Sequence, residues 1–196
     1  LNGFFNAKPL RKEEIRNGIK GKTKFLCMVG RFTKQKDQAT IIKAMKYLPE
    51  NVILLLVGDG PLRQNNEELA NEVGVSKKVI FLGMRKDVPN VFKTSDIAIV
   101  SSHWEGFGLV AVEAMAAGKP VIASNVPGLS EVVEGAGILF EKGDEIDLAK
   151  KIIKLIDNKC LYDEISNRCL ERSINYNINT MVRKYYEKYY AFNKTY

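Results

Sequence analysis

Cysteine, histidine and tryptophan are scarce in this 196-residue sequence, which contains three, one and one of them. No cysteines and histidines have the spacing of a zinc site, and an odd cysteine count argues against a disulfide framework. The motif Asp-x-Asp, which would offer paired carboxylates to a divalent cation, does not occur. We therefore expect a reducing compartment and a function that needs no metal.

Long apolar runs are also missing. None approaches the roughly 20 residues of a membrane-spanning helix, and no secretory signal is present. A composition of 45% hydrophobic and 27% charged residues is ordinary for one globular domain. The formal charge of +7 suits an anionic ligand, a membrane surface or nucleic acid. Basic residues are scattered, without an Arg-rich helix or a basic–aromatic pattern, which argues against nucleic acid.

Short apolar runs instead alternate with amphipathic stretches. Six runs predict buried strands: Phe25–Val29, Val52–Val57, Val79–Leu82, Ile97–Val100, Val121–Ala123 and Gly137–Phe140. Helices are expected at 39–48, Leu62–Val73 with Pro61 at its first position, 87–92, Leu109–Ala117, 127–133, Glu145–Ile156 and 178–190. This alternation predicts an α/β fold, a Rossmann-like open parallel sheet of about six strands with helices on both faces. Residues 1–20 form a polar, irregular lead-in.

Two basic residues follow the first predicted strand. Gly30 ends that strand, Arg31 and Lys36 come next, and Asp37 is a natural N-cap for the following helix. Backbone dipoles at a helix N-terminus favour an anion. The loop lacks the glycine pattern of a P-loop or a dinucleotide fingerprint. Two cations in this place would hold a diphosphate without a metal.

The stretch Glu105–Ser124 is the most informative part of the sequence. Gly106 and Gly108 allow a tight turn between the fourth strand and an apolar helix, in which Glu113 stands among alanines and valines. A buried carboxylate needs a partner. Glu113 therefore belongs either to a buried salt bridge or cap, or to a site where it accepts hydrogen bonds from a ligand diol.

Glu105-x7-Glu113, within Glu-Gly-Phe-Gly-Leu and followed by Gly-Lys-Pro-Val-Ile-Ala-Ser, resembles the GT-B glycosyltransferases and, more narrowly, retaining family 4. The resemblance covers about residues 2–190 and matches only the family's C-terminal half. It implies a hinge remnant at 1–20, a nucleotide-sugar-binding domain at 21–175, and a C-terminal helix at 176–196 that packs on the absent N-terminal domain. The tyrosine-rich face of that helix is then an orphaned interdomain surface.

The resemblance also implies roles for residues. Arg31 and Lys36 contact the donor diphosphate and, with Glu105, form the catalytic set. Glu113 accepts from the ribose hydroxyls. His103 is expected to pack a loop, because the family's catalytic-region histidine belongs to the other domain. The donor-binding set is Gly30, Arg31, Lys36, Gly58, Gly83, Met84, Glu105, Gly106, Phe107, Gly108, Leu109 and Glu113.

By resemblance the whole protein transfers a hexosyl unit from a UDP- or GDP-sugar to an acceptor hydroxyl in polysaccharide, lipopolysaccharide or glycolipid synthesis. It needs no cofactor, works in the cytoplasm or at the inner face of the membrane, and receives its acceptor glycan or lipid through the N-terminal domain. This chain alone is then a fragment inactive in transfer. Two alternatives remain: a nucleotide-binding or interaction module without chemistry, and a GT-B UDP-sugar epimerase.

Overall fold

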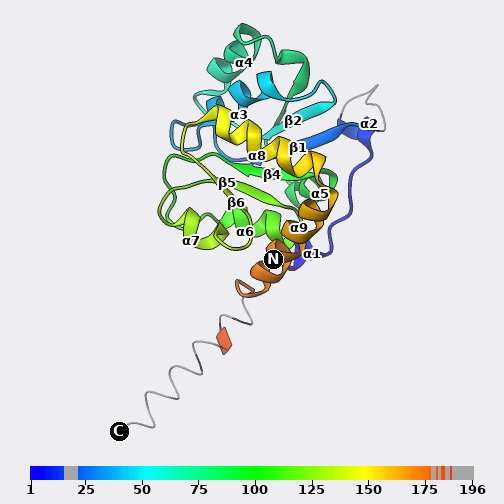
Figure 1. Ribbon diagram of the computed structural model, residues 1–196, viewed down its shortest axis with the longest axis vertical. Coiled ribbons are helices and arrows are strands. Elements are labelled where there is room, and N and C mark those ends of the chain that lie inside the picture. Colours follow the sequence, from blue (N-terminus) through cyan, green and yellow to red (C-terminus); the bar gives the residue numbers. More distant parts are fainter. Residues whose placement is uncertain (16–21, 178–179, 181, 184–185, 187–196) are drawn as a thin grey trace.

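The computed structural model describes residues 1–15, 22–177, 180, 182–183 and 186. Six strands form one parallel sheet in the order β3-β2-β1-β4-β5-β6 (Figure 1). Their bounds are β1 Lys24–Val29, β2 Val52–Val57, β3 Val79–Gly83, β4 Ile97–Val100, β5 Val121–Ser124 and β6 Ile138–Phe140. All six predicted strands are therefore confirmed to within one residue at each end.

Helices cover both faces of the sheet (Figure 1). On one face α3 (Gln38–Ala44) packs against α4 (Arg63–Glu72) and α8 (Glu145–Asp157). On the other, α6 (Leu109–Ala116) packs against α5 (Val88–Thr94), α7 (Leu129–Val133) and α9 (Lys159–Ile174). Two 3₁₀ turns, η1 (Met45–Tyr47) and η2 (Ser76–Lys78), complete this part of the chain.

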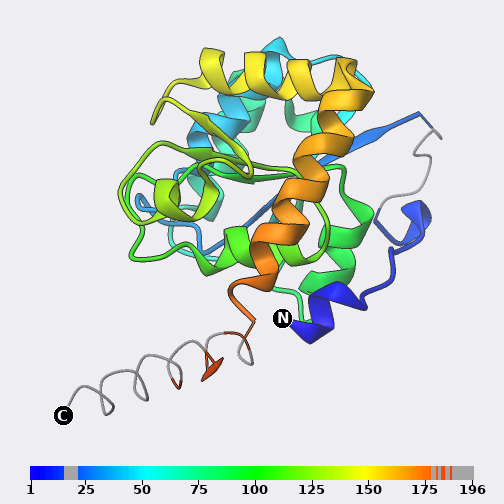
Figure 2. The ribbon, with the colours of Figure 1, turned by 60° about the horizontal axis from the view of Figure 1, so that its bottom comes forward.

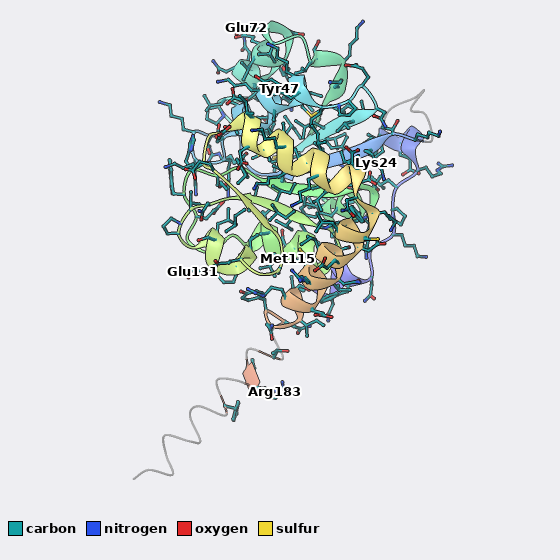
Figure 3. All side chains as sticks on the ribbon, viewed as in Figure 1. Lys24, Tyr47, Glu72, Met115, Glu131 and Arg183 are labelled. Atoms are coloured by element: carbon teal, nitrogen blue, oxygen red, sulfur yellow. The ribbon has the colours of Figure 1, made fainter. Side chains whose placement is uncertain are left out.

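The core lies between these layers. β4 and β5 are buried along their whole length, whereas the edge strands β3 and β6 are only partly buried. Met115 of α6, labelled in Figure 3, is fully buried. Parallel strands covered on both faces are expected to be continuously apolar, which is why short apolar runs located them.

The start of the chain differs from the sequence expectation. Residues 2–5 form α1 (Asn2–Phe5), and α2 is Lys12–Ile15. α1 packs on α5 and α6 (Figure 2). The rings of Phe4 and Phe92 are 6.3 Å apart. The start of the chain is thus docked on the domain instead of forming an irregular lead-in.

α4 begins at Arg63, not at Pro61 as predicted, because the amide of Leu62 donates to the Phe32 carbonyl (3.1 Å) and Pro61 belongs to the preceding turn. Most of the predicted helix 178–190, including Tyr185, Tyr189 and Tyr190, lies outside the described residues. Val182 and Tyr186 are described and exposed. None of the helices in the described part of the chain is long and apolar enough to cross a membrane.

Three glycines bring β1, β2 and β3 close together at their carboxyl ends. The Gly30 amide donates to the Val57 carbonyl (2.9 Å), and the Gly58 amide donates to the Gly83 carbonyl (2.8 Å). Gly58 has φ +129°, and a Cβ there would lie 2.1 Å from the Gly30 carbonyl oxygen. Only glycine fits this place, so the Gly58-Asp59-Gly60-Pro61 turn is a steric requirement of the sheet edge.

We expect Gly58→Ala to destabilise the protein by roughly 3 kcal/mol or more, because positive-φ strain adds to the clash with Gly30. Gly74→Ala is the matched control, since Gly74 also has a positive φ (+76°) but no atom within 4 Å of a new Cβ. It should cost only about 1–2 kcal/mol. Urea unfolding of both variants measures the difference, and equal losses would contradict the close approach.

Candidate functional site

The sheet order reverses between β1 and β4, which lie side by side although far apart in the sequence. Loops that leave two such strands at their carboxyl ends diverge to opposite faces, and ligands of open α/β sheets bind in the crevice between them. Here these loops are residues 30–37 and residues 101–108. In Figure 3 the opposite, amino edge of the sheet is on the side of Lys24.

An ion pair joins the two loops. The ammonium of Lys36 contacts Oε1 of Glu105, and both side chains are largely buried, at 20% and 10% exposure. The Ser102 hydroxyl donates to the same Oε1 (2.8 Å), and the buried Ser124 hydroxyl donates to the Ser102 carbonyl (2.5 Å). Lys36 and Glu105 are therefore held in place from β1, β4 and β5 together.

Polar contacts tie the same loops together a second time. The Ser101 hydroxyl donates to the Asp37 carbonyl (2.7 Å), and the His103 amide donates to the Gln35 carbonyl (2.8 Å). The Gln35 amide group donates to the Trp104 carbonyl (3.0 Å). The His103 ring stacks on Trp104 and lies 3.5 Å from the Asp37 carboxylate. These contacts are those expected of a loop-packing histidine.

Arg31 supplies an exposed cation at the same edge. Its carbonyl accepts from the Gln38 side chain (3.1 Å), which fixes the backbone where the loop leaves β1. Asp37 caps α3 as predicted, accepting from the Thr40 amide, and has a left-handed backbone with φ +52°. The loop thus presents Arg31 and Lys36 at the edge while its last residue starts the helix.

The N-terminus of α6 faces the same crevice edge. Its N-cap is Gly108, with φ +81° and no side-chain cap, so the first amides of the helix have no side-chain acceptor. A Cβ on Gly108 would lie 2.7 Å from Leu129. Unsatisfied amides at a helix start attract an anion. This uncapped helix start is compatible with anion binding by the amides of Gly108 and Leu109, which both belong to the expected donor-binding set.

Glu113 lies one turn further along α6 and is half-buried. Burial raises the pKa of its carboxyl group. No residue in the described part of the chain forms a hydrogen bond or ion pair with this carboxylate, so the salt-bridge or cap interpretation finds no partner there. The carboxyl group is half-exposed, the positive charge of the chain's N-terminal amino group opposes the pKa shift, and the carboxylate is free to accept hydrogen bonds from a ligand.

Exposed apolar side chains border the site. Met84 is 85% exposed and Leu109 66%, and Phe107 packs edge-on against Tyr176, with ring centroids 5.3 Å apart. Gly83 ends β3 and Met84 follows it, so β2 and β1 separate them from Glu105. The edge therefore holds a compact group around Lys36, Glu105 and α6, and a second group at β3.

Sequence reasoning missed Ser102, Ser124 and Tyr176. The serine pair before Glu105 was visible but gave no signal of which acceptor each hydroxyl takes. Among the described residues, no three His, Cys, Asp or Glu side chains gather into a group that could hold a metal ion. Metal independence itself stays a prediction.

A 3-2-1-4-5-6 parallel sheet with cations, a helix N-terminus and a carboxylate at its switch point is an arrangement typical of nucleotide-binding α/β proteins. The chain belongs to the family described as Glycosyl transferases group 1, whose model matches residues 11–174. It corresponds to the C-terminal domain of the GT-B fold, as its sequence predicted.

Curated relatives include a UDP-Gal:alpha-D-GlcNAc-diphosphoundecaprenol alpha-1,3-galactosyltransferase from Escherichia coli, 32% identical over 91% of this chain and 48% of that protein. Another is the N-acetyl-alpha-D-glucosaminyl L-malate synthase of Bacillus anthracis, 34% identical over 79% of this chain and 42% of that protein. The chain spans about half the length of these relatives.

Among solved structures, Anabaena Alr3699/HepE in complex with UDP and glucose superimposes with a TM-score of 0.81 at 26% identity, covering 93% of this chain and 54% of that one. The C-terminal domain of a Francisella tularensis group 1 family protein, LpcC, has a TM-score of 0.77 at 24% identity. It covers 89% of this chain and 97% of that one, so the same unit has been solved as a separate domain.

We expect Glu113→Gln to raise the melting temperature at pH 7. A carboxyl whose pKa is raised on folding stabilises the fold when protonated, and this stabilisation is lost as pH rises through that pKa. Glutamine stays neutral, so the gain should shrink towards about pH 4, near the unfolded pKa of glutamate. Calorimetric melting across this range measures it, and a large loss of stability at pH 7 would indicate a structural ion pair instead.

Proposed function

We propose that this chain is the nucleotide-sugar-binding half of a retaining, metal-independent glycosyltransferase that uses a UDP- or GDP-sugar. The observation that carries the proposal is the half-buried, unpartnered Glu113 one turn behind the open N-terminus of α6, at the edge that presents Arg31 and Lys36. A nucleoside diphosphate needs these three things: cations and amides for its phosphates, and a carboxylate for its ribose diol.

Arg31 and Lys36 would assist the departure of the nucleotide. When the bond between the anomeric carbon and the diphosphate oxygen breaks, the nucleotide leaves with the bonding electrons, and negative charge grows on its phosphates. Arg31 and Lys36, with the first amides of α6, would stabilise that charge. Arginine and lysine beside a helix N-terminus can replace a divalent cation in this role.

Glu105 would hold the sugar. Its Oε1 accepts from both Lys36 and Ser102, whereas Oε2 has no hydrogen-bond partner among the described residues. This division leaves one oxygen for a sugar hydroxyl and fixes its direction. Phe107 and Gly108 follow directly and would line the sugar, while Gly30 and Gly106 let the backbone approach the donor. Gly58 shapes the edge, and Gly83 and Met84 would meet the base.

Transfer also needs an acceptor hydroxyl, which the other half of the protein would present when the cleft closes. We propose a glycan or lipid acceptor in envelope polysaccharide, lipopolysaccharide or glycolipid synthesis, in line with the activities for which the relatives are named. The three free cysteines, Cys27, Cys160 and Cys169, favour a reducing compartment and hence the cytoplasm or the inner face of the membrane. The isolated chain should bind a donor but transfer nothing.

We expect UDP or GDP to bind with the same affinity in magnesium and in EDTA, because Arg31, Lys36 and the helix N-terminus neutralise the phosphates. Isothermal calorimetry measures both conditions, and strict dependence on magnesium would refute the mechanism.

Arg31→Ala should weaken nucleotide binding roughly 10–100-fold through the loss of a charge-assisted hydrogen bond. Lys34→Ala is the control. It removes an exposed cation on the same loop and should change the affinity little.

We expect Glu113→Gln to weaken nucleotide binding by roughly 10–100-fold. Glutamine keeps the shape of glutamate but removes the charge of the group that accepts hydrogen bonds from the ribose hydroxyls. The comparison of uridine diphosphate with its 2′,3′-dideoxy analogue tests the assignment. The analogue should bind wild type and variant alike, because it has no diol to donate. Equal losses for both ligands would place the effect elsewhere than at the ribose.

A further inference from the structure

A second pocket adjoins the donor site on the outer side of the loop after β1. It has a volume of about 390 Å³, within the range of roughly 300–1,000 Å³ typical of small-molecule sites. Its walls come from this loop, from α3 and α4, and from the loop after β4, and they include Thr33, Lys34, Gln38, Asn66, His103 and Trp104. None of these six belongs to the donor-binding set, so the pocket is separate from the proposed donor contacts.

Two nearly buried amide side chains in this wall have carbonyl oxygens without hydrogen bonds from the described residues. Gln38 is 2% exposed, and its nitrogen donates to the Arg31 carbonyl while its Oε1 is buried without a partner. Asn66 is 5% exposed, and its nitrogen donates to the Leu62 carbonyl (2.8 Å), which leaves Oδ1 as an acceptor. The Gln38 Oε1 has no solvent-accessible surface, so the acceptor that a ligand can reach is the Asn66 Oδ1, and a ligand with hydroxyl donors would satisfy it.

Trp104 provides a flat apolar surface at the same pocket. It is 58% exposed, although its backbone is held by Gln35 and its ring stacks on His103 at an interplanar angle of 19°. An aromatic ring fixed in advance loses little freedom on binding. The electron-rich face of the indole attracts the C–H groups of a saturated ring, whose carbon-bound hydrogens carry partial positive charge.

We propose that this pocket is a second carbohydrate-binding site that takes a neutral saccharide ring. The ring's C–H face lies over Trp104 and one of its hydroxyls donates to the Asn66 Oδ1. A saccharide combines one apolar face with many hydroxyl donors, which matches a wall that offers one indole and one free amide acceptor. The site adds to the proposed donor site and depends on no contact of that site.

The single tryptophan of the sequence makes the test direct, because all tryptophan emission comes from Trp104. The chain, saturated with UDP, is titrated with glucose, galactose, mannose, N-acetylglucosamine and their disaccharides. We expect a saturable change of emission with at least one saccharide. Asn66→Ala should weaken the saccharide affinity about tenfold, the effect of one lost hydrogen bond. Asn65→Ala, its exposed neighbour on α4, should not.

UDP affinity, measured separately by calorimetry, should be the same in both variants, so failure of the donor site and failure of this site are distinguishable. Should Asn66→Ala not fold, Trp104→Leu followed by calorimetry tests the platform, and saccharide binding should disappear. The proposal is overturned if no saccharide alters Trp104, if UDP alone produces the change, or if the two asparagine variants behave alike.

Discussion

The ion pair between Lys36 and Glu105 is the contact on which the site depends. Taking two charges out of water offsets most of their mutual attraction, so such a pair adds little to the stability of a fold. Its contribution here is to fix the two loops relative to each other, because it joins the loop after β1 to the loop after β4 across the switch point of the sheet. Glu105 also neutralises part of the charge of Lys36, which leaves Arg31 as the more exposed cation for an incoming phosphate.

That contact is possible because of the sheet order. Residues 36 and 105 are 69 positions apart in the sequence, yet β1 and β4 are neighbours through the pairs Leu26–Ile97 and Cys27–Ala98. Glycines let the surrounding backbone approach closely: a Cβ on Gly128 would lie 2.4 Å from the Glu105 carbonyl oxygen. The steric demands of the sheet edge and the electrostatic demands of the site therefore fall on the same few residues.

The sequence predicted the strands well because a parallel sheet covered on both faces must be made of apolar runs. It did not reveal α9 as one long helix. The residues that α9 buries, Ile165, Cys169 and Ser173, recur every four positions, but two of the three are not strongly apolar. The charged residue types of the site were predictable, whereas their partners were not, because Ser102 and Ser124 take acceptors that only the fold brings near.

The Glu113 carboxyl group is half-buried without a partner among the described residues, and burial disfavours its charged form. The Gln38 Oε1 is the one side-chain atom of the described structure that is buried without a hydrogen bond. Natural proteins tolerate such costs mainly where function requires them. The first group lies behind the N-terminus of α6, and Gln38 belongs to the wall of the pocket beside Trp104. The loop that carries Lys36 borders both places, and its ties to residues 101–105 hold them in one common frame.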